Sequence, residues 1–315
     1  MWKYIGIKEC NKFLLSLNLF ECKNEKKYIR TLYSISNRIE DNYKIFKIKK
    51  HNGKYRTIHE PNKLLKHIQT QILNNILNNK SISKYATAYH KGKSLKDNAI
   101  PHLNKKMLLK LDINDFFDNI TFLNIYNSCF SIEYFPKSVG MLLTTLCTYE
   151  DHLTQGSPTS SYISNLVMKD FDEEVGSWCE KKNISYTRYS DDMTFSGDFN
   201  VKEVINIVKT NLKKIGLQLN NDKIHVIKSN YCQNVTGVVV NKKMQVKKSY
   251  RNKIRQELFY IKKYGIDSHL EKKNIIDKNT YLNSLYGRIL FVLQINKDDN
   301  EFINYKNIIF NLIKN

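Results

Sequence analysis

The sequence is poor in the residues that build flexible linkers or cross-linked frameworks. Its 315 residues include only 11 glycines and 4 prolines, with no internal repeat and no low-complexity linker. The six cysteines stand at positions 10, 22, 129, 147, 179 and 232, and none belongs to a Cys-x-x-Cys pair. This spacing disfavours zinc ligation and is typical of reduced, mostly buried thiols. We therefore expect a globular protein from a reducing compartment.

Long apolar runs are also missing. Lys8, Glu9 and Lys12 interrupt the first apolar residues too early for a signal peptide. No window approaches the run of about 18 apolar residues that a membrane-spanning helix needs. We expect a cytoplasmic protein with no membrane partner.

Acidic residues are too few to balance the basic ones. The chain has 51 Lys and Arg against 30 Asp and Glu, a formal net charge of +21. Such an excess indicates a polyanionic partner, with nucleic acid first and an anionic membrane surface second. The bias toward Lys, Asn and Ile also suggests an AT-rich genome, which supplies part of the excess.

Two adjacent carboxylates stand between two predicted strands. The segment Tyr189-Ser190-Asp191-Asp192 lies between β-branched and aromatic runs, which indicates a hairpin with a tight turn. Neighbouring carboxylates that are partly desolvated need neutralisation, and a divalent metal is the usual solution. The alternative is an exposed acidic turn, because Asp is a common turn residue.

A third carboxylate follows a buried strand. Residues 107–111 form a nearly continuous apolar run, which predicts burial on both faces, and Asp112 stands where that strand ends. A strand end that opens onto a cleft makes Asp112 a site candidate. On pattern alone, Phe116 and Phe117 are core aromatics.

The N-terminal third predicts short helices followed by a basic ribbon. Residues 1–40 indicate two or three helices that pack as a cap. Residues 43–50 alternate apolar and basic, a turn follows at 51–54, and a second strand covers 55–58. Such a ribbon suits phosphate binding, although lysines also protect exposed edge strands. The later Gly92-Lys93-Ser94 lacks the earlier glycine of a Walker loop.

Two later segments add a loop and a basic helix. Residues 155–161 form a Gly/Ser/Pro cluster before a helix, which indicates either a substrate-lining loop or a simple N-cap. Residues 242–263 carry nine basic side chains against one acid, Glu257. Lys247, Arg251 and Arg255 share a stripe beside an apolar one, which favours phosphate-backbone binding over a merely solvated face.

Three carboxylates and a basic surface together favour phosphoryl transfer. Hard cations take oxygen ligands. Two metal ions ~3.5–4 Å apart activate an attacking hydroxyl and stabilise the leaving oxygen. Nucleotide addition needs this chemistry and little covalent help from protein side chains.

In this light the chain resembles the reverse transcriptases, and among them the bacterial retron type. The resemblance covers about residues 43–295 and keeps the family's motif order. The matching motifs are Leu111-Asp112-Ile113-Asn114-Asp115-Phe116-Phe117, Gln155-Gly156-Ser157-Pro158, Tyr189-Ser190-Asp191-Asp192, and Gly216-Leu217-Gln218-Leu219-Asn220 with Lys223. Ser190 and Ser157 stand where Ala is commoner in the family, and both changes are small.

The resemblance implies a role for each matched residue. Asp112, Asp191 and Asp192 would be catalytic and bind two Mg²⁺ ions, with the Ile113 carbonyl as a further ligand. Phe117 would exclude a ribose 2′-hydroxyl, which replaces its core interpretation. The implied nucleotide-binding residues are Lys54, Arg56, Phe117, Gln155 and Lys223.

Two further motifs point to the retron type. Residues 98–102 match its Asn-Ala-x-x-His signature, and Val235-Thr236-Gly237 matches its Val-Thr-Gly signature. The family implies that both help to recognise a structured noncoding RNA. On pattern alone, His102 is a core histidine and Thr236 a plain strand residue. The implied RNA- or DNA-binding residues are Asn98, His102, Tyr189, Thr236, Lys247, Arg251 and Arg255.

The predicted fold is an α+β right-hand polymerase. It has interleaved fingers and palm, an antiparallel palm sheet packed on helices, and a small helical thumb. The expected domains are a helical cap at 1–35, fingers and palm at 36–240, and the thumb at 241–315.

The predicted function is RNA-directed DNA synthesis from deoxynucleoside triphosphates. Template and primer would both come from a cognate noncoding RNA, primed at an internal 2′-hydroxyl to give branched RNA–DNA in an anti-phage system. We expect any effector to be a separate protein. Alternatives are an abortive-infection reverse transcriptase, a non-catalytic RNA-binding scaffold and a membrane-surface protein. A group II intron enzyme is disfavoured, because 315 residues leave no room for its further domains.

Overall fold

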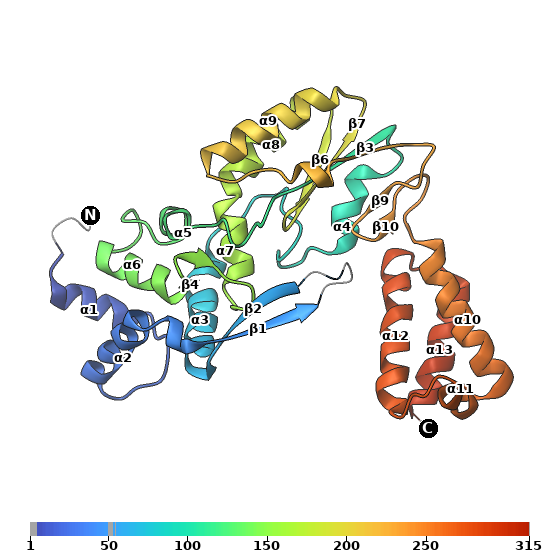
Figure 1. The fold of residues 1–315 in the computed structure, drawn as a ribbon, viewed down its shortest axis with the longest axis horizontal. Coiled ribbons are helices and arrows are strands. Elements are labelled where there is room, and N and C mark those ends of the chain that lie inside the picture. Colours follow the sequence, from blue (N-terminus) through green and yellow to red (C-terminus); the bar gives the residue numbers. More distant parts are fainter. Residues whose placement is uncertain (1–4, 50–52, 54, 315) are drawn as a thin grey trace. The chain divides into compact units, whose positions relative to one another are not determined.

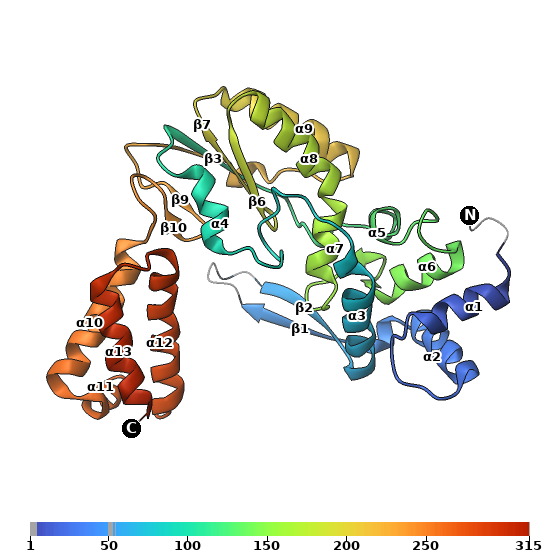
Figure 2. The ribbon, with the colours of Figure 1, turned by 180° about the vertical axis from the view of Figure 1, so that it is seen from behind.

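The computed structural model describes residues 5–49, 53 and 55–314. The α-helices are α1 (Ile7–Ser16), α2 (Glu25–Asn37), α3 (Lys63–Asn75), α4 (Leu95–Ala99), α5 (Phe122–Cys129), α6 (Lys137–Leu146), α7 (Ser160–Val167), α8 (Lys169–Lys181), α9 (Val201–Lys214), α10 (Lys248–Tyr264), α11 (Ile266–Lys272), α12 (Lys278–Ile295) and α13 (Asn300–Lys314). The strands are β1 (Tyr43–Lys49), β2 (Tyr55–Pro61), β3 (Met107–Asp112), β4 (Thr148–Tyr149), β5 (His152–Leu153), β6 (Ser185–Tyr189), β7 (Asp192–Gly197), β8 (His225–Lys228), β9 (Asn234–Val235), β10 (Val238–Val239) and β11 (Gln245–Val246). Figures 1 and 2 show them from opposite sides.

The basic ribbon is an antiparallel pair of strands. Strands β1 and β2 pair in full register from Tyr43 opposite Pro61 to Lys49 opposite Tyr55. Most β1 side chains are exposed, as the alternation of apolar and basic residues predicts for a ribbon that lies outside the core. Of the predicted turn, Gly53 is described, with φ of +81°, whereas Lys54 lies outside the described residues.

The central sheet has the strand order β6-β7-β3-β8. Strand β3 is buried along most of its length, as its apolar run predicts. Helices α8 and α9 lie side by side, and α8 packs on β6 (Figure 2). The predicted hairpin is confirmed, because β6 ends at Tyr189 and β7 begins at Asp192. The end of β3 and the hairpin turn therefore come from neighbouring parts of one sheet.

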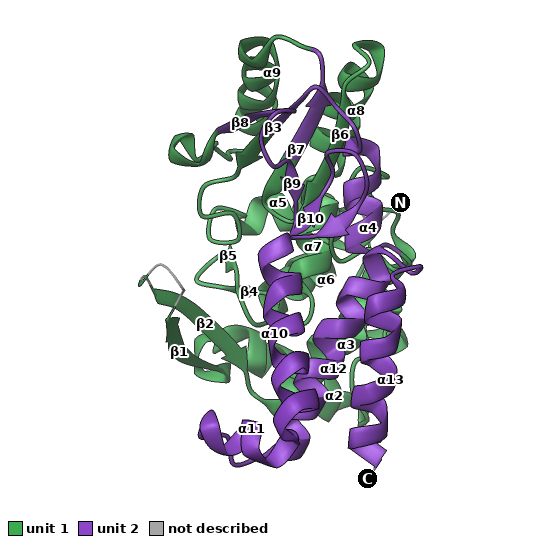
Figure 3. Ribbon diagram, turned by 90° about the vertical axis from the view of Figure 1, so that its right-hand side faces the viewer, with its two compact units in different colours: residues 1–92, 110–193, 199–224 green, residues 93–109, 194–198, 225–315 purple. Residues whose placement is uncertain are grey.

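The chain forms two compact units, coloured separately in Figure 3. The first contains residues 1–92, 110–193 and 199–224, and the second contains 93–109, 194–198 and 225–315. The predicted thumb, 241–315, lies wholly in the second unit, where α10 to α13 bury an apolar core with β9, β10 and β11. None of the helices in the described part of the chain combines the length and the apolar character needed to cross a membrane.

Two short segments pair with the central strands without forming regular strands. Residues 217–223 do not form a regular strand: Leu219 makes a single bridge to Ile113, and a 3₁₀ turn follows at Asn221–Lys223. Ala86 likewise makes a single bridge, to Arg188. Further main-chain bonds hold both segments, including Asn220 amide to Asp112 carbonyl at 2.8 Å and Thr87 amide to Arg188 carbonyl at 2.9 Å. The six cysteines are free thiols, and four of them are buried, as their spacing predicts.

Candidate active site

The hairpin turn holds two carboxylates next to the end of β3. Ser190 occupies the turn with φ of +60°, a conformation that is uncommon for a residue other than glycine. The amide of Ile113 donates to the carbonyl of Asp191 at 3.2 Å, so the residue after Asp112 is bonded to the turn. The structure thus brings Asp112, Asp191 and Asp192 together from two separate segments, as predicted.

These carboxylates lie in a partly desolvated, mutually repulsive environment. Asp112 is 6% exposed. Burial raises the pKa of Asp112, and the charges of Asp191 and Asp115 add to the increase. Burial likewise raises the pKa of Asp192, with Asp191 as the next cause. A bound cation would offset both effects.

Lys223 supplies one positive charge to this cluster. Its Nζ lies 2.8 Å and 2.9 Å from the two carboxylate oxygens of Asp112. Burial lowers the pKa of Lys223, but the bond to Asp112 and the three aspartate charges outweigh it and raise that pKa. The pKa of Asp112 stays raised despite this partner, because burial raises it more than the Lys223 ion pair lowers it. Lys223, predicted to bind nucleotide, therefore lies beside the predicted metal ligands.

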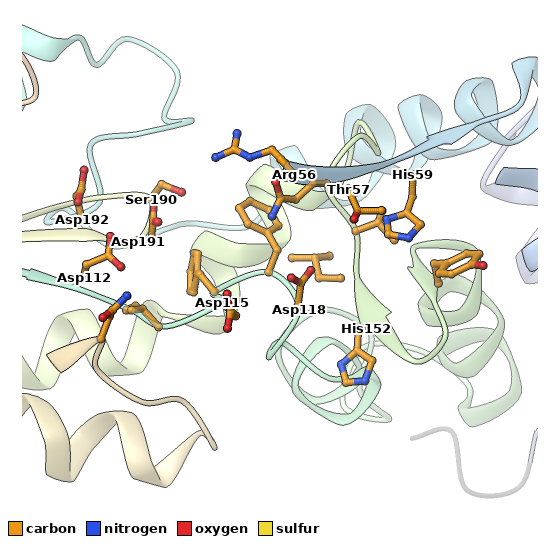
Figure 4. Close-up of a pocket in the computed structure, with 18 of the residues that line it drawn as sticks. Arg56, Thr57, His59, Asp112, Asp115, Asp118, His152, Ser190, Asp191 and Asp192 are labelled. Atoms are coloured by element: carbon orange, nitrogen blue, oxygen red, sulfur yellow. The ribbon is translucent and has the colours of Figure 1, made fainter. Parts of the chain in front are cut away.

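The three aspartates stand at one end of a cavity of about 720 Å³. Figure 4 shows Arg56 extending from β2 toward this end, with His59 and His152 at the other end. The cavity also contains most of the predicted nucleotide-binding set, together with Ile113 and Tyr189. These lining residues are Arg56, Phe117, Gln155 and Lys223. An open polar cavity of this composition suits a charged ligand that enters from solvent.

A close main-chain contact joins the ribbon to the Gln155 loop. The amide of His59 donates to the carbonyl of Gln155 at 2.9 Å. Gly156 has φ of +133°, and a Cβ there would lie 2.5 Å from the carbonyl oxygen of His59. Only glycine permits this approach. Gly156 therefore fixes the wall of the cavity that carries Arg56 and Gln155.

The donor set fits a hard divalent cation in its chemistry. Carboxylate and carbonyl oxygens are the ligands that Mg²⁺ and similar ions prefer. Within the described ranges, no three His, Cys, Asp or Glu side chains are grouped closely enough to hold a metal ion. Asp112 instead has an ammonium group on both of its oxygens. A metal ion at Asp112 would therefore share these oxygens with Lys223 or displace it.

The two predicted signature motifs are bonded to protein groups of the second unit. Asn98 is 1% exposed, and its Nδ2 donates to Thr236 Oγ1 at 3.2 Å. His102 is fully buried, with Nδ1 2.7 Å from Ser196 Oγ. Burial lowers the pKa of His102 to about 3, so the ring is neutral. Direct RNA contact by these side chains stays a prediction, and the bonds seen here brace the fold.

The predicted thumb arginines have acidic partners. Arg251 Nη2 lies 2.6 Å from Asp299 Oδ2, and Arg255 forms two bonds to Glu301, at 2.7 Å and 2.6 Å. Lys247, by contrast, is exposed at the start of α10. Nucleic-acid binding by these three residues stays a prediction.

Sequence reasoning missed several residues of the cavity and one residue behind it. Thr57 and His59 line the cavity, and the His59 ring packs 4.6 Å from that of Tyr149. Strand alternation places both on the face of β2 that also carries Tyr55, so the period-two pattern could have identified them. Arg188, buried behind the hairpin turn, had no local signal because its partner is distant in sequence.

Comparison with known proteins identifies the family of this chain. Residues 48–257 match the family described as reverse transcriptase (RNA-dependent DNA polymerase). The retron Ec83 reverse transcriptase of Escherichia coli is 34% identical over 282 residues, which are 83% of this chain and 85% of that protein. The retron Ec86 reverse transcriptase of Escherichia coli is 28% identical over 225 residues, 70% of each chain.

Among solved structures, a telomerase from Candida albicans in complex with a fragment of telomeric RNA aligns over 90% of this chain and 68% of that one. Its TM-score is 0.48 and its sequence identity 11%. The family match alone covers more than half of the chain. With it, the predicted right-hand polymerase fold and RNA-directed DNA polymerase activity are confirmed, and the chain belongs to the bacterial retron-type reverse transcriptases.

Proposed function

We propose that this chain reverse-transcribes one cognate, structured noncoding RNA, using Mg²⁺ at Asp112, Asp191 and Asp192. The observation that carries the proposal is the convergence of these three carboxylates at one end of an open cavity whose wall bears Arg56. Polymerases of this family generally use divalent metal ions. When bound, two such ions would activate the attacking hydroxyl and stabilise the leaving oxygen.

The chain's own side chains would bind and orient the substrates. Arg56 would hold the triphosphate by charge-assisted bonds, and Gln155 would line the nucleotide position. Phe117 is half-buried in the cavity wall and packs edge-on against Phe116, with ring centroids 5.5 Å apart. A ring supported in this way would resist displacement by a ribose 2′-hydroxyl, so Phe117 would select deoxynucleotides.

The finer biological assignment rests on the retron relatives. We propose that priming uses an internal 2′-hydroxyl of the same RNA, which gives a branched RNA–DNA product. We also propose that this product acts in anti-phage defence together with a separate effector protein. Support comes from the motifs at residues 98–102 and 235–237 and from the similarity to a retron enzyme over 83% of this chain.

The decisive experiment compares the wild type with Asp191→Asn/Asp192→Asn. Each protein is purified with the RNA encoded beside its gene and given Mg²⁺ and radiolabelled deoxynucleotides. From the wild type we expect a labelled branched product whose gel mobility increases when RNase removes its RNA part. From the variant we expect no labelled product. RNA affinity, measured by filter binding, should be nearly unchanged. Synthesis by the variant would contradict the metal assignment, and unbranched product from the wild type would contradict the priming proposal.

A further inference from the structure

Behind the Asp191–Asp192 turn lies a fully buried ion pair. Arg188 of β6 and Asp172 of α8 both have side chains that are 0% exposed. The Arg188 Nε lies 2.8 Å from Asp172 Oδ1, and Nη2 lies 2.6 Å from Oδ2. Tyr186 donates its hydroxyl to the same carboxylate at 2.8 Å. Removing two charges from water is unfavourable, and the ion pair offsets this penalty only with very good geometry. Stabilisation of the fold is therefore not a sufficient reason for this pair.

The remaining nitrogen of the guanidinium reaches the catalytic turn. Arg188 Nη1 donates to the main-chain carbonyl of Ser190 at 2.9 Å. Ser190 is the residue with φ of +60°, and the two predicted metal ligands follow it directly. A strained turn conformation persists only where surrounding groups determine it. The guanidinium supplies such a constraint from the interior of the protein.

The Arg188 main chain is fixed as well. Its amide donates to the carbonyl of Tyr85, and its carbonyl accepts from the amide of Thr87, both at 2.9 Å. Tyr85 packs against α8 at Gly176, where a Cβ would lie 2.1 Å from the Tyr85 ring. Strand β6, the 85–87 segment and α8 thus hold one another closely. The base from which Arg188 reaches the turn is therefore rigid.

We propose that Arg188 is a positioning residue that, held by Asp172, keeps the turn at Ser190 in the conformation in which Asp191 and Asp192 bind metal. The inference rests on the proposed metal site. The planar guanidinium places two nitrogens on the Asp172 carboxylate and the third on the Ser190 carbonyl. The single ammonium group of lysine cannot reproduce this bidentate geometry, so lysine is not an equivalent replacement.

The test measures metal binding directly. Mn²⁺ is titrated into the full chain without nucleotide, and free Mn²⁺ is followed by electron paramagnetic resonance. We expect Arg188→Lys to raise the Mn²⁺ dissociation constant about tenfold, the size of effect expected when a charged hydrogen bond is lost. Val175→Ala, a truncation at a fully buried position of α8, is the matched control. It should lower the melting temperature and leave the dissociation constant unchanged.

A rescue variant separates positioning from general destabilisation. Glycine adopts positive φ without a Cβ penalty, so Ser190→Gly makes the turn less dependent on its brace. In the Ser190→Gly background, we expect Arg188→Lys to raise the dissociation constant less than about threefold. Equal effects of Arg188→Lys in the two backgrounds would overturn the inference. If Arg188→Lys does not fold, Tyr186→Phe, which removes one bond to Asp172, should raise the constant by a smaller factor, and an unchanged constant would refute the role.

The same titration distinguishes this inference from the proposed function. If the wild type and Asp192→Asn bind Mn²⁺ equally, the metal assignment fails, and the inference fails with it. If Asp192→Asn loses binding while Arg188→Lys retains wild-type affinity, only the positioning role is refuted.

Discussion

Acidification should destabilise the protein through the buried imidazole of His102. Burial lowers the pKa of His102 to about 3, with a smaller contribution from the charge of Lys105, whereas an unfolded chain titrates near its ordinary value. Between these two values the unfolded state binds more protons than the folded state. The contribution of neutral His102 to the free energy of unfolding is therefore fully present above the pKa of the unfolded state. It is lost progressively as the pH drops toward 3. Each pH unit below about 6.5 costs about 1.4 kcal/mol, so the loss at pH 5 is about 2 kcal/mol.

The assay compares the wild type with His102→Gln by urea unfolding at pH 7.5, 6 and 5. Glutamine does not titrate, so the difference between the two free energies of unfolding isolates the imidazole from the carboxylates that titrate in both proteins. We expect the wild type to be the more stable protein at pH 7.5, by a margin that shrinks by about 2 kcal/mol at pH 5. A margin independent of pH would refute the buried, neutral ring. A large loss of RNA affinity at unchanged stability would instead support direct RNA contact.

Three further predictions concern substrates. Phe117→Val should admit ribonucleotides, seen as alkali-sensitive product in primer extension, and unchanged sugar discrimination would refute the steric gate. Lys223→Gln should raise the KM for deoxynucleotides about tenfold, as expected for a lost charged contact. Lys209→Gln, at an exposed position of α9, is the control, and equal KM values for Lys223→Gln and the wild type would refute nucleotide binding by Lys223. Lys253→Gln should reduce the salt slope of duplex binding by about 1. Arg255→Gln should mainly lower the melting temperature, because Arg255 is already paired with Glu301. The reverse pattern would assign the phosphate contact to Arg255.

The sequence predicted the elements whose signals are local. The hairpin around Asp191, the buried strand ending at Asp112 and the ribbon of Arg56 each follow from period-two patterning and short turns. That these segments converge was inferred from the motif order of a family, because spacing alone does not show which strand ends meet. In the structure, β3 and β7 are neighbouring strands of one sheet, and this pairing is what brings Asp112 close to the Asp191–Asp192 turn.

Contacts between distant segments account for what the sequence did not reveal. Arg188 and Asp172 are 16 residues apart on different elements, and neither stands in a recognisable motif. The basic stripe of α10 had one acid nearby in sequence, yet its arginines meet Asp299 and Glu301 at the start of α13. His102 is buried, as its pattern alone predicts, but its partner Ser196 lies 94 residues away in the sequence. In each case a polar side chain has a tertiary partner that no local pattern encodes.

These pairings distinguish the arginines of α10 from its exposed lysines. Four of the seven arginines, at 188, 251, 255 and 288, form ion pairs with carboxylates of the chain itself. The planar guanidinium of arginine suits a fixed, bidentate carboxylate partner, whereas the ammonium group of lysine is strongly hydrated and sits at the end of a flexible side chain. The exposed basic surface of α10 consists of lysines, including Lys248, Lys253 and Lys263.

Lysines of this kind contact phosphates without reading bases, and they make binding dependent on salt. The large positive charge of the chain therefore accounts for affinity toward nucleic acid in general. Selection of one cognate RNA, as proposed above, would need a surface of defined shape. We expect that recognition at the turn of Thr236, which has φ of +45° and accepts the Asn98 bond at its hydroxyl.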